Sequence, residues 1–191
     1  MKLPNRATCI ISLTSIVVGI SFALGVAASG VVKAQLPAVI TSLGQSPDGY
    51  TASVLAKRAQ LQIEYKNLMP AEEVSNYKTV IMAVGASLKG FGSAGVNLDT
   101  ELKRGAEIVK ACKDQNVLLV IFHTGGEGRR EQMSNRLLDT VAAKANYLVV
   151  LEESNQDEYF TNVSRENNIP ITVVESVIKI QDILKEMFGG Q

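Results

Sequence analysis

The sequence predicts an α/β fold: one three-layer, doubly wound domain with a mostly parallel sheet of five or six strands, preceded by an N-terminal signal or anchor helix. Three observations predict it. Short β-branched runs alternate with segments of helical periodicity, the central runs are apolar on both faces, and 191 residues are about the length of one domain. No repeat or Pro/Ser-rich linker interrupts residues 36–188, so we assign residues 35–191 to one α/β domain.

Six runs have the composition of strands. Three of them are apolar throughout, as expected of central parallel strands covered by helices on both faces, whereas the second run alternates polar and apolar residues and is expected at an edge. The expected strands are Ala38–Leu43, Gln62–Tyr65, Thr79–Val84, Val117–Phe122, Tyr147–Leu151 and Ile171–Val174.

Helical segments separate these runs. Because the connection between the second and third strands is short, the sheet order 2-1-3-4-5-6 of flavodoxin-like folds is favoured, with the Rossmann-like order 3-2-1-4-5-6 as the alternative. Both orders place a ligand site at the carboxyl ends of the strands, where the order reverses. The expected helices are Thr51–Gln60, a short one at Pro70–Tyr77, Asp99–Gln115, Arg130–Ala145, Glu158–Asn167 and Val177–Phe188.

The first 34 residues have the charge pattern of an export signal. Lys2 and Arg6 precede a stretch without charged residues from Ala7 to Val32, which is the arrangement of a signal peptide. Cleavage after Ala34 would remove it, and an uncleaved signal anchor is the alternative because the stretch is long enough to span a bilayer. We therefore expect an extracytoplasmic protein: secreted, periplasmic, or tethered to the outer face of the cytoplasmic membrane. It would contact a membrane only through residues 7–32, if these stay attached.

Composition argues against several classes of function. Residues 1–34 contain three basic and no acidic residues, so their removal lowers Lys+Arg from 19 to 16 against 19 Asp+Glu, a net charge of −3. Such a domain is not expected to bind nucleic acid. Cys9 and Cys112 provide neither a disulfide framework nor a thiolate zinc site. One histidine and scattered carboxylates do not form a ligand cluster, so no metal is predicted.

The first strand ends in the turn Gly44-Gln45-Ser46-Pro47-Asp48. A turn that opens a helix leaves backbone N–H groups free to bind an anion. The alternative is an ordinary strand-to-helix connection in which Asp48 or Ser46 caps the helix.

The third strand is followed by eleven residues that include four glycines, from Gly85 to Gly95. Glycine backbone can approach a ligand closely, and a long loop without secondary structure is more often functional than not. The spacing matches neither a P-loop nor a dinucleotide-binding turn. The candidate ligand-binding residues in this loop are Gly85, Ser87, Lys89, Gly90 and Gly92.

The fourth strand ends in the most polar segment of the chain, His123 to Arg130. Two arginines at a helix start oppose the helix dipole, so local stability does not explain them, and guanidinium groups there can bind a carboxylate or phosphate. The alternative is a structural role, in which one arginine forms an ion pair with Glu127. The candidate ligand-binding residues in this segment are His123, Gly125, Gly126, Glu127, Arg129 and Arg130.

Taken together, the three segments resemble a family of bacterial proteins labelled domain of unknown function 6305. The resemblance rests on Gly44-Gln45-Ser46, on the glycine-rich segment Gly85–Gly95 and on His123–Arg130, together with the signal segment, and covers Leu36–Phe188. It implies an extracytoplasmic α/β domain with a shared site at these loops. It implies no substrate.

The leading hypothesis is an exported domain that binds a small anionic ligand in the crevice between the three loops, without a cofactor. A second is a hydrolase or transferase with His123 as acid or base and Ser46 or Ser87 as nucleophile. A third is a flavin carrier in which an aromatic side chain stacks on FMN. A fourth is a domain that docks an unidentified protein partner near the membrane. The aromatic candidates for flavin stacking are Tyr50, Phe91 and Tyr159.

Overall fold

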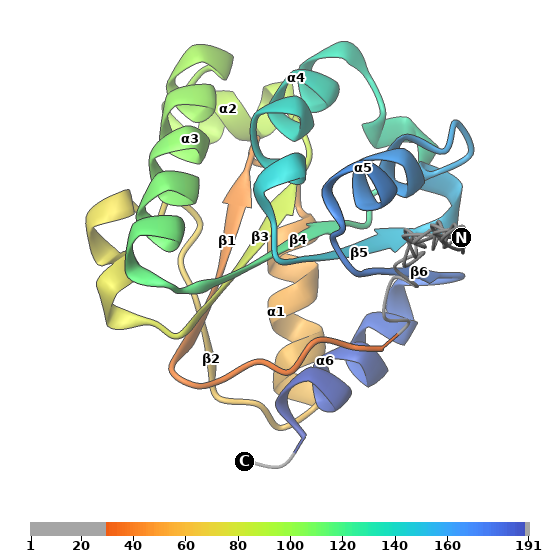
Figure 1. Cartoon of the computed structure of the whole chain (residues 1–191). Helices are drawn as coiled ribbons and strands as arrows, with labels where there is room; N and C mark the ends of the chain where they lie inside the picture. Colours follow the sequence, from red (N-terminus) through yellow and green to blue (C-terminus); the bar gives the residue numbers. More distant parts are fainter. Residues whose placement is uncertain (1–29, 190–191) are drawn as a thin grey trace, which may run out of the picture.

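A six-stranded, all-parallel sheet forms the centre of the protein, with the order β2-β1-β3-β4-β5-β6 (Figure 1). The structure is a computed structural model and describes residues 30–189. The predicted α/β class is confirmed, and of the two sheet orders the flavodoxin-like one is correct. The expected signal or anchor helix lies almost entirely outside the described residues.

Most strands have the predicted bounds. The third, fourth and fifth strands are the central ones, as their apolar composition predicted, and the second is an edge strand of three residues. The fourth begins and ends one residue later than predicted, because the N–H of Val117 still caps the preceding helix by donating to Cys112 O at 2.9 Å. The strands are β1 Ala38–Leu43, β2 Ile63–Tyr65, β3 Thr79–Val84, β4 Leu118–His123, β5 Tyr147–Leu151 and β6 Ile171–Val174.

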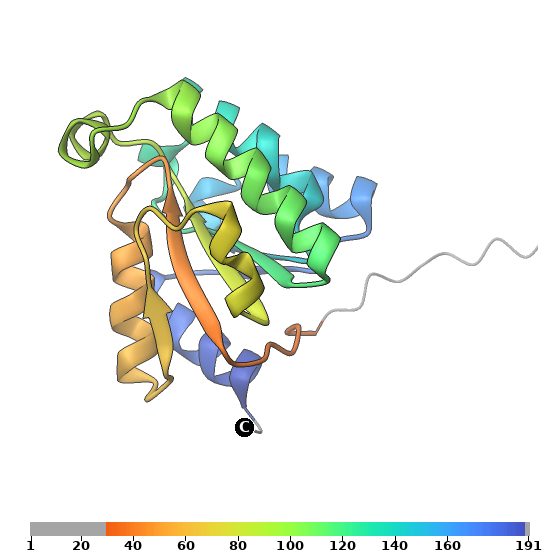
Figure 2. The same cartoon turned by 90° about the vertical axis from the view of Figure 1, so that its left-hand side faces the viewer.

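Helices cover both faces of the sheet (Figures 1 and 2). One face is covered by α1 Asp48–Arg58 and α6 Ile180–Phe188, whose apolar residues share a core with β1, β3, β4 and β5. The other face carries the remaining helices, which pack on a larger core. These helices are α2 Leu88–Ala94, α3 Leu98–Gln115, α4 Gln132–Val141 and α5 Tyr159–Asn167.

Short 3-10 helices account for most departures from the predicted helix bounds. The helix expected at Arg130–Ala145 begins at Gln132 and ends at Val141, and the next three residues form η3. The helix expected at Val177–Phe188 is divided in the same way, with a 3-10 turn before α6. The 3-10 helices are η1 Ala71–Asn76, η2 Glu127–Arg129, η3 Ala142–Lys144, η4 Glu152–Ser154 and η5 Val177–Lys179.

The glycine-rich segment after β3 is not the loop that the sequence predicted, because its centre forms helix α2. The Ser87 hydroxyl caps this helix by accepting from the Gly90 N–H at 3.1 Å, and Gly95 ends it in the left-handed region with φ 69°. An N-cap serine and a left-handed C-terminal glycine are helix signals that outweigh the low helix propensity of glycine.

Both hydrophobic cores and all six strands lie within residues 34–188. This stretch therefore contains the complete core of a folding unit. None of the helices within residues 30–189 is long and apolar enough to cross a bilayer.

Candidate functional site

The three polar segments meet at the carboxyl edge of the sheet, where β1 and β3 send the chain to opposite faces. Here the first two loops are joined by backbone hydrogen bonds. The Ser46 N–H donates to Gly85 O at 3.1 Å, and the Ser87 N–H donates to Gly44 O at 2.8 Å. Both N–H groups are therefore used within the protein, including that of Ser46, which belongs to the turn suggested for anion binding.

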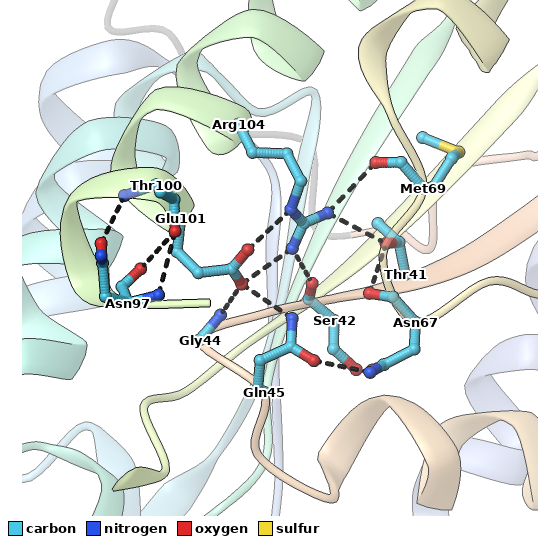
Figure 3. A network of polar contacts seen from close by, with 10 residues as sticks. All are labelled: Thr41, Ser42, Gly44, Gln45, Asn67, Met69, Asn97, Thr100, Glu101 and Arg104. Atoms are coloured by element: carbon cyan, nitrogen blue, oxygen red, sulfur yellow. Dashed lines mark hydrogen bonds and ion pairs between the residues drawn. The ribbon is translucent and has the colours of Figure 1, made fainter. Parts of the chain in front are cut away.

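A buried ion pair from α3 holds the first loop in place (Figure 3). Glu101 is fully buried, and its Oε2 accepts hydrogen bonds from the Gly44 N–H at 2.7 Å and from Gln45 Nε2 at 2.8 Å. The Arg104 Nε donates to the other carboxylate oxygen at 2.7 Å. Asn67 completes the network by donating from Nδ2 to Gln45 Oε1 at 2.6 Å. The loop is thus positioned by a helix that follows it by more than fifty residues.

The hydrogen-bond partners of Glu101 stabilise its ionised form. Burial alone would raise the pKa of this carboxyl, but the hydrogen bonds and charge of Arg104, with the donors of Gln45 and Gly44, hold the pKa below its ordinary value. Arg104 also donates to the carbonyl oxygens of Ser42 and Met69. The network retains Gln45 at φ 62°, a left-handed conformation that is costly for a residue with a side chain.

The sequence analysis missed Glu101 and Arg104. A signal was present: Glu101 occupies the same helix face as Gly105, Ile108 and Cys112, which are buried. A carboxylate on a buried helix stripe requires a charged partner, and an arginine three residues later can supply it.

The centre of the site is a cluster of Ser46, Asp48 and Arg129. The Ser46 hydroxyl donates to Asp48 Oδ2 at 2.8 Å. Both Asp48 and Arg129 lie against Gly125: a Cβ built on this glycine would be 2.9 Å from Asp48 Oδ2 and 2.1 Å from Arg129 Cγ. Arg129 Nη1 donates to Ala86 O at 3.1 Å, which joins the third loop to the second. Residues from all three predicted segments are therefore in contact here.

The two charged groups of this cluster, Asp48 and Arg129, have different electrostatic environments. Burial raises the pKa of Asp48, while the Ser46 hydrogen bond and the charge of Arg129 oppose the increase. Among residues 30–189, Arg129 forms no ion pair within 4.0 Å, and its one side-chain hydrogen bond goes to the Ala86 carbonyl. A half-buried guanidinium with unused donors thus lies beside a carboxyl that is less acidic than usual.

Arg130 has a different environment. Its guanidinium donates to both carboxylate oxygens of Asp157 at 2.9 and 2.8 Å and to Ser154 O at 2.7 Å. It also lies over the rings of Tyr159 and Phe160, with its carbon 4.7 and 5.2 Å from the ring centroids. Its donors are therefore used to fasten the loop after β4 to the one after β5. The partner is Asp157 and not Glu127, which is exposed.

His123 is fully buried and is not hydrogen-bonded to either candidate nucleophile. Its Nδ1–H donates to Val84 O at 2.8 Å, and its ring lies 5.2 Å from that of Phe160. Nε2 has no hydrogen-bond partner among the residues that the structure describes. Burial, together with the charges of Arg130 and Arg129, lowers the pKa to about 4, against the opposing effect of the Val84 bond. No hydrogen bond joins it to Ser46, which bonds to Asp48, or to Ser87, which caps α2.

The remaining candidates have separate environments. Lys89 is exposed on α2. Gly90 permits close packing, because a Cβ there would lie 2.1 Å from Gln45 O, whereas a Cβ on Gly92 would meet nothing within 4 Å. Gly126 adopts φ 70°, where glycine is favoured.

The residues considered for cofactors differ in access. Phe91 is buried in the core and Tyr159 covers Arg130, whereas Tyr50 is 60% exposed at the start of α1. Residues 30–189 contain no group of three His, Cys, Asp or Glu side chains placed to hold a metal ion. A cavity of about 420 Å³ lies beside Arg130, and half of its lining residues are acidic: Glu127, Glu131, Glu153 and Asp157.

Comparison with known proteins supplies a family but no activity. No curated protein matches the chain. A solved structure of the psychrotrophic esterase EstA from Pseudoalteromonas sp., inhibited by monoethylphosphonate, aligns with 78% of this chain and 93% of its own at 11% identity and a TM-score of 0.29. A similarity this low carries no argument about activity. A family model described as a domain of unknown function, DUF6305, matches residues 35–188, and the chain therefore belongs to this family.

Proposed function

We propose that this protein is an exported domain that binds a small anionic ligand at the carboxyl edge of its sheet, with Arg129 as the residue that holds the anionic group. One observation carries the proposal. Arg129 lies where all three polar loops meet. Among residues 30–189 it has no ion-pair partner, and only one side-chain hydrogen bond is formed by its guanidinium group. An unpaired, half-buried guanidinium is suited to bidentate recognition of a carboxylate or phosphate.

The neighbours of Arg129 restrict the chemistry of the ligand. Asp48 and Ser46 lie beside it, so a second group that hydrogen-bonds to a carboxyl or hydroxyl would complete the contacts. Arg130 is not part of this proposal, because Asp157 and Ser154 already use its donors. A hydroxy acid, an amino acid or a phosphate monoester has the required combination of an anionic group and a hydrogen-bonding group.

The test is thermal unfolding of residues 30–191 against phosphates, carboxylates, amino acids, nucleotides and FMN. A ligand present at about 100 times its Kd stabilises the folded state by about 2.7 kcal/mol, which raises the Tm of a domain of this size by several degrees. We expect Arg129→Ala to abolish the shift and Arg136→Ala, an exposed arginine on α4, to retain it. An undiminished shift in Arg129→Ala would refute the assignment.

Turnover of the same ligand distinguishes binding from catalysis. A binding domain leaves the ligand unchanged over hours, as monitored by mass spectrometry. Consumption that stops in Ser46→Ala would favour the hydrolase hypothesis instead, because Ser46 is the candidate nucleophile that is hydrogen-bonded to a carboxylate.

Export has its own test. Mass spectrometry of the protein from its native cells identifies the first residue. A chain beginning at or near Gln35 supports cleavage and export, and an intact N-terminus in the cytoplasmic fraction contradicts them.

A further inference from the structure

The amino edge of the sheet, opposite the Arg129 site, is rich in basic residues. All strands are parallel, so helices that follow a strand run back and end at this edge (Figure 2). Exposed lysines and arginines occupy the last turns of α1, α3 and α6, the 3-10 helix η3 and the connection before β3. The exposed basic residues of this edge are Lys57, Arg58, Lys78, Lys110, Lys113, Lys144 and Lys185. The acidic residues in the last turns of α3, α4, α5 and α6 are Asp114, Asp139, Glu166 and Glu186.

Overall charge does not explain this distribution. Residues 30–191 lack Lys2 and Arg6 and so contain 17 basic against 19 acidic residues. The acidic excess lies at the other edge, where four carboxylates line the cavity beside Arg130. Helix dipoles favour cations at the C-terminal ends of helices. They do not account for Lys78, which lies outside any helix.

A cavity opens within the basic edge, between the ends of α3, η3 and α5. Its volume is about 790 Å³, and none of its lining residues is acidic. Lys110 pairs with Asp114 at the rim, and Lys144 donates to Thr140 O at 2.8 Å. Among residues 30–189, Lys113 forms no ion pair. Three lysines and three asparagines line the cavity together with apolar residues, and their ammonium and amide groups suit a phosphate-bearing headgroup.

The N-terminal segment joins the domain at the same edge. The Ala34 N–H donates to Met187 O at 2.8 Å, and Lys33 Nζ donates to Glu186 O at 2.9 Å, both near the end of α6. From there the chain runs along this edge to β1 (Figure 2). The described residues that precede β1 therefore meet the domain at its basic edge and not at its acidic one.

We propose that the amino edge is a docking face for an anionic lipid bilayer. Each Lys or Arg near such a surface raises membrane partitioning about fivefold. Docking in this orientation would hold the Arg129 site on the side away from the lipid, open to ligands in solution. This face extends the expectation from sequence, in which a membrane was contacted only through residues 7–32. It does not depend on the proposed ligand.

The test is cosedimentation of residues 30–191, which contain the complete core, with vesicles of phosphatidylcholine containing about 30 mol % phosphatidylglycerol. The first variant replaces Lys110, Lys113 and Lys144 with Gln. A matched control replaces Lys103, Arg136 and Lys179 with Gln. These residues are exposed elsewhere on the surface, and the control has the same net charge because it also loses three positive charges. A second edge variant replaces the basic residues in the last turns of α1 and α6 with Gln: Lys57, Arg58 and Lys185. Thermal unfolding checks that each variant is folded.

We expect the wild-type domain to bind these vesicles at about 50 mM NaCl, to release at about 500 mM and not to bind pure phosphatidylcholine. Each edge variant should lose on the order of 100-fold in partitioning, and the control less than about threefold. Failure of the wild-type domain to bind, equal binding to neutral vesicles, or an equal loss in the control would each overturn the proposal. Ligand-induced stabilisation through Arg129 is measured without lipid, so the two proposals fail independently.

Discussion

The buried histidine makes stability depend on pH, and the size of the effect follows from its environment. Burial lowers the pKa of His123 from 6.5 to about 4 in the folded protein, whereas the unfolded chain retains the ordinary value. Each pKa unit corresponds to about 1.4 kcal/mol. Lowering the pH from 7 to below 4 should therefore cost about 3 kcal/mol of unfolding free energy through this one residue, a large share of the total for a small domain.

The sign follows from proton binding. Above pH 6.5 the imidazole is neutral in both states and contributes no pH dependence. Between pH 6.5 and about 4 the unfolded chain binds a proton that the folded protein does not, so stability falls as the pH falls. Glu101 and Asp157, whose pKa values are lowered by their arginine partners, also lose stabilising charge in acid. Their effect is removed by comparison with a variant.

Urea unfolding of residues 30–191 at pH values from 4 to 7.5 measures the effect, with His123→Gln as the control. A Gln amide can still donate to Val84 O but does not titrate, so the difference between the two proteins isolates the histidine. The chain has one histidine, so its NMR signals report the folded pKa directly in tag-free protein. Parallel stability curves for the two proteins, or a folded pKa near 6.5, would refute the reasoning.

Two further predictions concern the framework of the site, and both are measured by urea unfolding. Glu101→Ala leaves the largely buried Arg104 without its counter-ion and should cost ~3–5 kcal/mol, whereas Glu107→Ala, on the exposed side of the same helix, should change stability by less than ~0.5 kcal/mol; equal effects would contradict the assigned role. Gly90→Ala places a methyl group 2.1 Å from a main-chain oxygen and should destabilise by ~1–3 kcal/mol, whereas Gly92→Ala, in open space on the same helix, should stabilise by up to ~1 kcal/mol. A stabilising Gly90→Ala would show that α2 does not pack as described.

The order of elements and the class of the fold could be predicted from the sequence because the signals are local. Apolar runs such as Thr79–Val84 and Tyr147–Leu151 have the composition typical of a parallel strand covered on both faces, and the polar alternation of the second run indicates an edge. The placement of the candidate site at the carboxyl edge also followed, because polar loops after parallel strands meet at one edge of the sheet. Helix α2 was not predicted, because the high glycine content of Gly85–Gly95 indicated a loop, although Ser87 and Gly95 are residues that typically begin and end a helix.

The tertiary structure alone decided which side chains pair. Arg129 and Arg130 are adjacent in sequence and of the same type. Arg129 lies near Ala86 and Asp48 and forms no ion pair within the described part of the chain, whereas Arg130 is paired with Asp157. Glu101 reaches back to Gly44, and His123 to Val84, across intervals that no sequence period spans. Local propensity depends on neighbours along the chain and can be read from them. The choice of a charge partner, and the pKa that results, depends on which distant segments the packed core brings within hydrogen-bond distance and removes from water.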